Sequence, residues 1–266
     1  MSREYISPEG LRLDGRKAEE LRKIQCKLGI FSRADGSAYY QQGNTKVVAS
    51  VFGPREVVRK GQALHDRAIV TCEYSMATFS SGERRRKAKG DRRATEISLV
   101  MRQTLEAAIM TSLFPRSQID IFVQILQADG GTRCAAINAA TLALIDAGIP
   151  MRDFVVSAAA GYINGTPILG SFSITSTSSS YSQLTLFLKD LNYVEDSAGG
   201  PDLPVAILPK SGKVTMLQMD SKLPMDKFEE VLRLAVKGCH IIYQLLREHV
   251  KDYTVDLYDS RGSSSS

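Results

Sequence analysis

Residues 117–150 have the sequence SQIDIFVQILQADGGTRCAAINAATLALIDAGIP, which places a β-strand directly before an α-helix. Between Ile119 and Ile125 every second residue is apolar, the period of a strand with one buried face. From Thr132 the apolar residues follow helical spacing, and Gly148, with a proline two residues later, predicts the end of that helix. A short Asp-Gly-Gly turn therefore joins the strand to the helix.

This turn has the features of a phosphate-binding site. The first N–H groups of a helix lack partners within the helix, and the helix dipole adds partial positive charge there. Gly131 permits close approach of an oxyanion, Thr132 can cap the helix or offer its hydroxyl, and Arg133 adds a planar bidentate donor. The alternative interpretation is a capped helix with Arg133 merely exposed. The turn is not a Walker A loop, because no Lys-Ser or Lys-Thr pair follows it.

Outward from this stretch, the chain alternates further strands with two more helices. Patterning predicts strands at 24–30, 37–40, 46–52, 68–74, 154–163, 204–208 and 214–219, a hairpin turn at Asn164-Gly165, and helices at 93–112 and 225–251. Gly53-Pro54 is expected to end the third of these strands. This order predicts an α+β fold rather than a doubly wound sheet. We expect one domain over 1–258 and a disordered polar tail over 259–266.

The positive charge of the chain is unevenly distributed. The net charge is only +5, but the segment 84–93 contains Arg84, Arg85, Arg86, Lys87, Lys89, Arg92 and Arg93, opposed by Asp91 alone. Such a cluster creates a local positive potential that attracts polyanions such as RNA. A solvated basic loop is the alternative, and the segment by itself does not decide between them.

Composition indicates an ordinary globular protein in a reducing compartment. The chain has 266 residues, of which 43% are hydrophobic and 24% charged. No apolar run approaches the roughly 20 residues needed to cross a bilayer, and the N-terminus lacks a signal-peptide core, so no membrane partner is expected. The four cysteines have no CxxC spacing, which indicates neither a zinc site nor a disulfide framework.

A second candidate site lies in DLNYVEDSAGG, residues 190–200, which follows a predicted strand. Asp190 and Asp196 could converge on one divalent cation, because carboxylate oxygens suit Mg²⁺ or Mn²⁺, and one of them could protonate a leaving oxygen. A polar loop with turn-forming aspartates is the alternative. Lys210 or Lys213 could add positive charge, although both are equally plausible as hairpin-tip lysines.

Together these motifs resemble the RNase PH family, in particular exosome ring subunits of the type that carries the catalytic carboxylates in the archaeal complex. The matching stretches are SPEGLRLDGR (7–16), GNTKVVASVFGPRE (43–56), Asp91-Arg92-Arg93, LQADGGTRCAAINAATLALIDAGIPMRD (126–153) and DLNYVEDSAGG (190–200). The similarity covers the chain except for about 170–189 and the tail.

The resemblance implies an RNase PH fold, with two related β-α-β halves of the ribosomal-protein-S5-domain-2-like type. It also implies phosphorolysis, in which inorganic phosphate attacks the 3′-terminal phosphodiester of RNA and releases a nucleoside diphosphate. The resemblance implies that Gly131, Thr132 and Arg133 bind the attacking phosphate. It also implies that Asp190 and Asp196 hold the metal and assist the leaving 3′-oxygen. RNA contacts are expected from Arg92 and Arg93, together with the basic residues Arg84, Arg85 and Arg86.

The partners implied are RNA 3′ ends, other RNase PH-like subunits in a hetero-hexameric exosome ring, and RNA-binding cap subunits. The implied location is the nucleus, including the nucleolus, and the cytoplasm. Because the chain keeps Arg133, Asp190 and Asp196, an active phosphorolytic subunit is favoured. The alternatives are a catalytically silent scaffold in the ring and a free-standing RNase PH that trims transfer-RNA 3′ ends as a homohexamer.

One stretch departs from the family pattern. GSFSITSTSSSYSQLTLFLK (170–189) intervenes where family members run from a segment like Thr166–Leu169 directly into the equivalent of Asp190. In one hypothesis, Leu184–Leu188 replaces Thr166–Leu169 in the sheet, the serine-rich part lengthens a hairpin at little entropic cost, and Asp190 keeps its place. In the other, the insert reflects an alternative transcript or a gene-model error and displaces Asp190.

Overall fold

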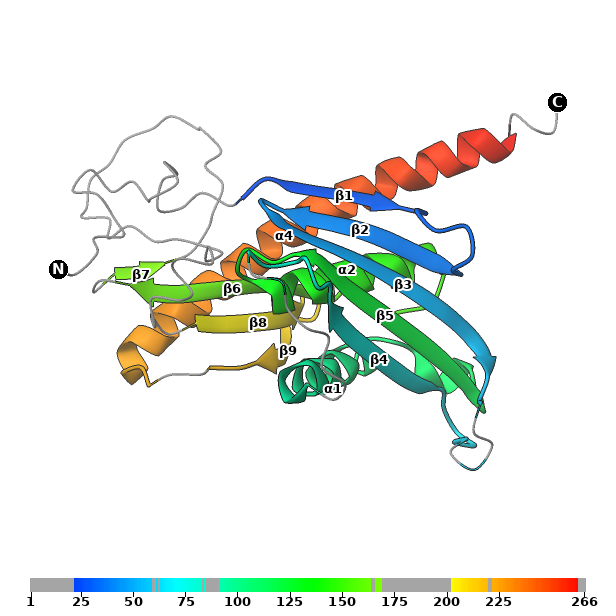
Figure 1. Ribbon diagram of the computed structural model, residues 1–266, viewed down its shortest axis with the longest axis horizontal. Coiled ribbons are helices and arrows are strands. Elements are labelled where there is room, and N and C mark those ends of the chain that lie inside the picture. The colour runs from blue at the N-terminus through cyan, green and yellow to red at the C-terminus, as the bar shows by residue number, and fades with distance from the viewer. Residues whose placement is uncertain are drawn as a thin grey trace.

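The computed structural model describes residues 22–58, 61, 63–82, 84, 91–163, 166–168, 202–219 and 222–262. These residues form two β-sheets with a helix between them and further helices at the outside (Figure 1). The α+β class predicted from the order of strands and helices is therefore confirmed.

The first sheet has five strands. In spatial order they are β1 (Ile24–Leu28), β2 (Gly36–Gln42), β3 (Thr45–Glu56), β5 (Ser117–Gln127) and β4 (Ile69–Met76). Every neighbouring pair is antiparallel except β4 and β5, which are parallel. Parallel neighbours need a crossover connection, and the helix α1 (Arg92–Glu106) lies in that connection. Alternate residues of β3 and β5 are buried, as their period of two predicts.

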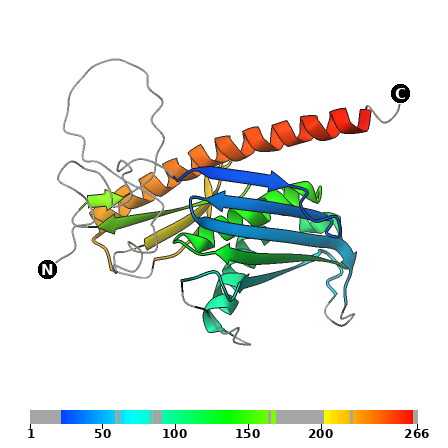
Figure 2. The same cartoon turned by 45° about the horizontal axis from the view of Figure 1, so that its top comes forward.

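The helix α2 (Thr132–Asp146) occupies the centre of the molecule, between the two sheets (Figures 1 and 2). Every residue from Cys134 to Leu144 is buried, which fits a helix that is apolar on all sides. The helix contacts β2 and β3 on one side and β6 on the other. Among the described residues, one continuous core joins both sheets through α2; the single domain expected over 1–258 stays a prediction.

The second sheet has four antiparallel strands. They are β7 (Thr166–Ile168), β6 (Val156–Ile163), β8 (Asp202–Leu208) and β9 (Lys213–Leu217) in spatial order. Because Thr166–Ile168 pairs with β6, the hypothesis that Leu184–Leu188 replaces this segment in the sheet is wrong. The insert 170–189 itself lies outside the described residues.

The long helix α4 (Met225–Gly262) packs on β6 and β8 through buried side chains from Val231 to Leu246. Its C-terminal half is anchored by the Tyr253 hydroxyl, which donates to Asp146 Oδ1 at 2.8 Å. The helix continues past the predicted end near Lys251, and four residues of the predicted disordered tail are helical. The sequence prediction failed here because Gly262 is the first residue after 251 that favours a helix end.

Other boundaries also differ from those predicted. The helix α1 ends at Glu106, and a separate 3₁₀ turn, η2 (Thr111–Leu113), follows it. Strand β3 passes Gly53-Pro54 and pairs again from Arg55, because a register irregularity after Phe52 accommodates the proline within the strand. No helix in the described part of the chain combines the length and apolar character needed to cross a membrane.

Candidate phosphate-binding site

The predicted turn joins β5 to α2 through two glycines in left-handed conformations. Gly130 has φ 73° and Gly131 has φ 61°, a region that glycine adopts without steric cost. Gly131 is the N-cap of α2 and Thr132 is its first helical residue, so the interpretation of Thr132 as the cap is wrong. The N-cap position has a positive φ, a conformation that glycine adopts at less cost than threonine.

The start of α2 lies at the surface although the rest of the helix is buried. Gly131, Thr132 and Arg133 are each half-exposed, whereas burial begins at Cys134. The N-cap residue Gly131 has no side chain that could cap the helix. The positive end of the dipole of this helix therefore lies at half-exposed residues, a place that favours negative charge.

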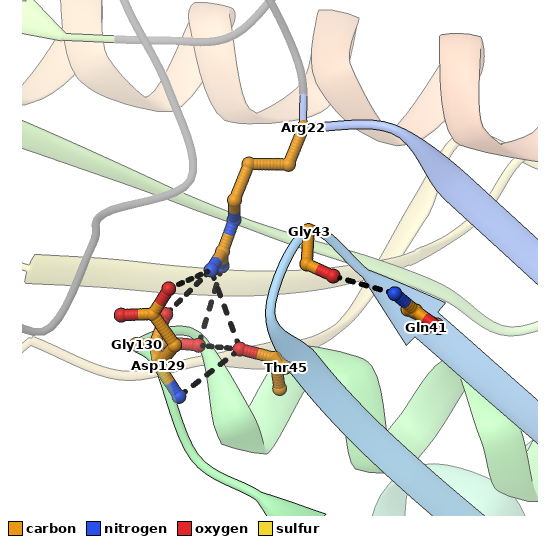
Figure 3. A network of polar contacts seen from close by, with 6 residues as sticks. All are labelled: Arg22, Gln41, Gly43, Thr45, Asp129 and Gly130. Carbon is orange, nitrogen blue, oxygen red and sulfur yellow. Dashed lines mark hydrogen bonds and ion pairs between the residues drawn. The ribbon is translucent and has the colours of Figure 1, made fainter. Parts of the chain in front are cut away.

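Behind the turn lies a polar network formed by two residues that the sequence patterns did not single out (Figure 3). The Arg22 guanidinium donates to the carbonyl of Asp129 and, at 3.3 Å, to the carbonyl of Gly130. The Thr45 hydroxyl also donates to the Gly130 carbonyl, at 2.9 Å. Arg22 Nη1 lies 3.7 Å from the Asp129 carboxylate. In the sequence, the only indication of a role for Thr45 was its place in the GNTK stretch, which forms a hairpin turn.

The basic residues divide between described and undescribed parts of the chain. Arg92 and Arg93 begin α1 and are exposed, and the Asp91 side chain caps that helix by accepting from the Arg93 N–H at 3.2 Å. Arg84 is also exposed. Arg85 and Arg86 lie outside the described residues.

The loop that leads into the basic segment passes beside the phosphate turn. The N–H of Ala128, one residue before Asp129, donates to the carbonyl of Ser80 at 2.8 Å. The Ala77 N–H in turn donates to the Ile125 carbonyl at 2.9 Å. The fold therefore starts the basic segment from a point adjacent to the turn.

The carboxylate site is not described. Asp190 and Asp196 lie outside the described residues, and within the described ranges no three His, Cys, Asp or Glu side chains gather as a metal site. Both candidate lysines are exposed at the β8–β9 hairpin, with Lys210 in the turn and Lys213 opening β9. This placement agrees with the interpretation of both as hairpin-tip lysines.

Two family models match the chain. Domain 1 of the 3′ exoribonuclease family (RNase PH) matches residues 20–150, and domain 2 of that family matches residues 175–238. The chain belongs to the 3′ exoribonuclease family. The first match contains the phosphate turn and the start of α1, and the second begins within the insert and contains 190–200.

Several curated relatives support this membership along nearly the whole chain. The Exosome complex component RRP41 homolog of Arabidopsis thaliana is 58% identical over 255 residues, which cover 96% of this chain and 97% of that protein. The mouse (Mus musculus) Exosome complex component RRP41 is 51% identical over 261 residues, which cover 96% of this chain and 98% of that protein. The Exosome complex component Rrp41 of Methanopyrus kandleri is 46% identical over 247 residues, which cover 93% of this chain and 95% of that protein.

Solved structures agree on the fold. A crystal structure of rice (Oryza sativa) Rrp46 superposes with a TM-score of 0.73 at 20% identity and covers 90% of this chain and all of that one. A structure of the Archaeoglobus fulgidus exosome with RNA bound to the active site superposes with a TM-score of 0.71 at 21% identity. It covers 90% of this chain and 93% of that one. The predicted RNase PH fold is confirmed by these likenesses and by the family models.

Proposed function

We propose that this 3′ exoribonuclease family member is a core ring subunit of an exosome and that it degrades RNA from the 3′ end by phosphorolysis. Its plant, animal and archaeal relatives are named as exosome components, and a structural neighbour is an exosome with RNA at its active site. The observation that carries the catalytic part is the Gly131-Thr132-Arg133 turn. Its left-handed glycines and half-exposed arginine stand at the start of a buried helix.

In the proposed reaction an oxygen of inorganic phosphate attacks the phosphorus of the last phosphodiester bond. The bond from that phosphorus to the 3′-oxygen of the preceding nucleotide breaks, a nucleoside diphosphate leaves, and the 3′-oxygen takes up a proton. Two polyanions must approach each other, so positive groups are needed to screen their repulsion. Arg133 and the first N–H groups of α2 are proposed to bind the attacking phosphate, and Arg92, Arg93 and Arg84 to bind RNA phosphates.

Asp190 and Asp196 are proposed to hold Mg²⁺ or Mn²⁺ and to assist the leaving 3′-oxygen, since hard carboxylate oxygens suit these cations. Arg85 and Arg86 are proposed to extend the RNA path. The proposed partners are other RNase PH-like subunits, which complete a hetero-hexameric ring, and RNA-binding cap subunits. The proposed locations are the nucleus, including the nucleolus, and the cytoplasm.

The test is to reconstitute the ring with this chain and incubate it with a 5′-labelled RNA in the presence and absence of inorganic phosphate. We expect shortened RNA and nucleoside diphosphates only when phosphate is present. Arg133→Lys keeps the charge but removes the bidentate fork, so it should lower kcat/KM for phosphate by about 10-fold or more. An intact ring that releases no diphosphate would make the chain a silent scaffold, and a homohexamer active alone would refute the heteromeric assembly.

A further inference from the structure

The carbonyl groups of the phosphate turn accept hydrogen bonds from two side chains that lie far from the turn in the sequence. Arg22 precedes β1 and Thr45 begins β3, yet both bind the turn that follows β5 (Figure 3). Both side chains are sequestered from water: Arg22 is 7% exposed and Thr45 is 0% exposed. Neither is therefore available as a direct ligand for RNA or phosphate in solution.

The Thr45 hydroxyl uses its full hydrogen-bonding capacity on this network. A hydroxyl has one donor and two acceptor lone pairs. The donor goes to the Gly130 carbonyl at 2.9 Å, while the oxygen accepts from the Asp129 N–H at 3.3 Å and from Arg22 Nη1 at 3.3 Å. Thr45 thereby links the Asp129 N–H and the Gly130 carbonyl to the buried arginine.

The hairpin between β2 and β3 makes room for the arginine. Gly43 has φ 60°, and a Cβ built on it would lie 2.4 Å from Cδ of Arg22. The Gly43 N–H donates to the Lys23 carbonyl at 2.9 Å, and its own carbonyl accepts from the Gln41 amide at 2.9 Å. The backbone immediately after Arg22 is therefore held against the hairpin while the arginine side chain reaches the turn.

The direction of these hydrogen bonds determines the direction of the N–H groups. In a planar trans peptide the C=O and the following N–H point in opposite directions. The carbonyls of Asp129 and Gly130 point toward Arg22 and Thr45. The N–H groups of Gly130 and Gly131 must therefore point away from this network, as a backbone anion site requires.

Arg22 also compensates the one negative side chain of the turn. The Asp129 carboxylate lies 3.7 Å from Arg22 Nη1, and an uncompensated carboxylate beside a phosphate site would repel the ligand. The ion pair is largely shielded from solvent, with 6% and 16% of the two side chains exposed. Solvent screening of this pair is therefore weak.

We infer that Arg22 and Thr45 are positioning residues, which hold the Asp129–Gly131 backbone so that the N–H groups of Gly130 and Gly131 bind the attacking phosphate. The inference rests on the proposed function of this turn. Neither residue touches the reacting atoms. Each acts through the carbonyl oxygens on the far side of the same peptide groups.

The test uses conservative variants in the reconstituted ring. Thr45→Val keeps the shape but removes the hydroxyl, and Thr45→Ser restores it. Arg22→Lys keeps the charge but cannot bond two carbonyls with one planar fork. The matched control is Thr104→Val, since Thr104 is equally buried and its hydroxyl donates to the Val100 carbonyl at 2.8 Å inside α1.

Two quantities are measured for each ring: the KM for inorganic phosphate, and the phosphate Kd by calorimetry without RNA. Thr45→Val and Arg22→Lys should raise both by about 10-fold, because each variant removes buried hydrogen bonds that hold the backbone of the turn. Thr45→Ser and Thr104→Val should stay within about twofold of the parent ring. The Kd for a phosphorothioate-ended RNA without phosphate should not change, whereas general unfolding would weaken RNA and phosphate binding together.

The outcomes separate this inference from the proposed function. A parent ring that releases diphosphates, combined with unchanged phosphate KM in Thr45→Val and Arg22→Lys, would overturn the inference alone. A parent ring that binds phosphate in a Thr45-dependent way without releasing diphosphates would uphold the positioning role and overturn the catalysis. A parent ring that does not bind phosphate would overturn both.

Discussion

At the scale of single residues, Asp120 shows how a buried charge is accommodated in the first sheet. The residue is 4% exposed, and its carboxylate accepts hydrogen bonds from the Thr71 hydroxyl, the Gln118 amide and the Arg55 guanidinium. Burial by itself raises the pKa of this carboxyl, but the three hydrogen bonds outweigh burial and lower the pKa below its ordinary value. The charged form is therefore the one that the fold stabilises.

We expect Asp120→Asn to lower the free energy of unfolding by about 1 kcal/mol at pH 7. Because the folded pKa is lowered, this contribution is present above the unfolded pKa of about 3.9 and is lost as the pH falls through the folded value. Urea unfolding at pH 7 and pH 3.5 measures this contribution. The difference in the free energy of unfolding between parent and variant should be smaller at pH 3.5. An equal gap at both pH values would contradict this.

A matched control is available on the surface. Asp66 Oδ2 lies 3.1 Å from an Arg67 guanidinium nitrogen, but both side chains are exposed. Exposed ion pairs are screened by water and contribute little. Asp66→Asn should therefore leave the urea unfolding curve unchanged at pH 7. This result would show that the loss of stability in Asp120→Asn depends on burial and not only on a neighbouring arginine.

At the scale of elements, the contact between β2 and α2 depends on a missing side chain. A Cβ on Gly36 would lie 2.3 Å from the Ala143 carbonyl oxygen and 2.3 Å from the Ala147 nitrogen. Both are backbone atoms, which cannot rotate away. The glycine at the start of β2 therefore sets how closely the central helix approaches the first sheet.

Gly36→Ala should destabilise the protein by about 1–3 kcal/mol, because the added methyl group overpacks a backbone contact. Thermal unfolding measures the loss. The control is Gly82→Ala, where a Cβ would meet nothing within 4 Å among the described residues. Equal melting temperatures for the two variants would show that the helix can move without cost.

The elements were predictable to different degrees, and the reasons are physical. Strand β5 and the start of α2 were predicted correctly because the change from a period of two to helical spacing, with glycines between, is contained in adjacent residues. The end of β3 was predicted wrongly at Gly53-Pro54, because strand pairing with β5 resumes at Arg55. Such pairing depends on the partner strand rather than on local residues.

At the scale of the whole molecule, exposed arginines at the start of α1 are expected to set the salt dependence of RNA binding. Each neutralised phosphate of a single strand contributes about 0.7 to the slope of log K against log salt. Replacing both Arg92 and Arg93 by Gln should therefore reduce the slope by about 1.4. Fluorescence anisotropy with the reconstituted ring at several salt concentrations measures this change.

Arg233→Gln provides the control for that experiment. Arg233 is equally basic and exposed, but it lies on α4 and pairs with Glu229 at 3.5 Å within the same helix. We expect no change of slope for this variant. A similar decrease in both variants would show that the RNA responds to net charge and not to the start of α1.

The sequence by itself determined the α+β class, the strand–turn–helix unit of residues 117–146 and the candidate residues Gly131, Thr132 and Arg133. All of these depend on neighbouring residues in the chain. Only the tertiary structure showed how the turn is supported, because Arg22 and Thr45 are 108 and 85 residues from Gly130. The register that pairs Lys46 with Gln127 brings Thr45 beside the turn, and no local periodicity encodes that register.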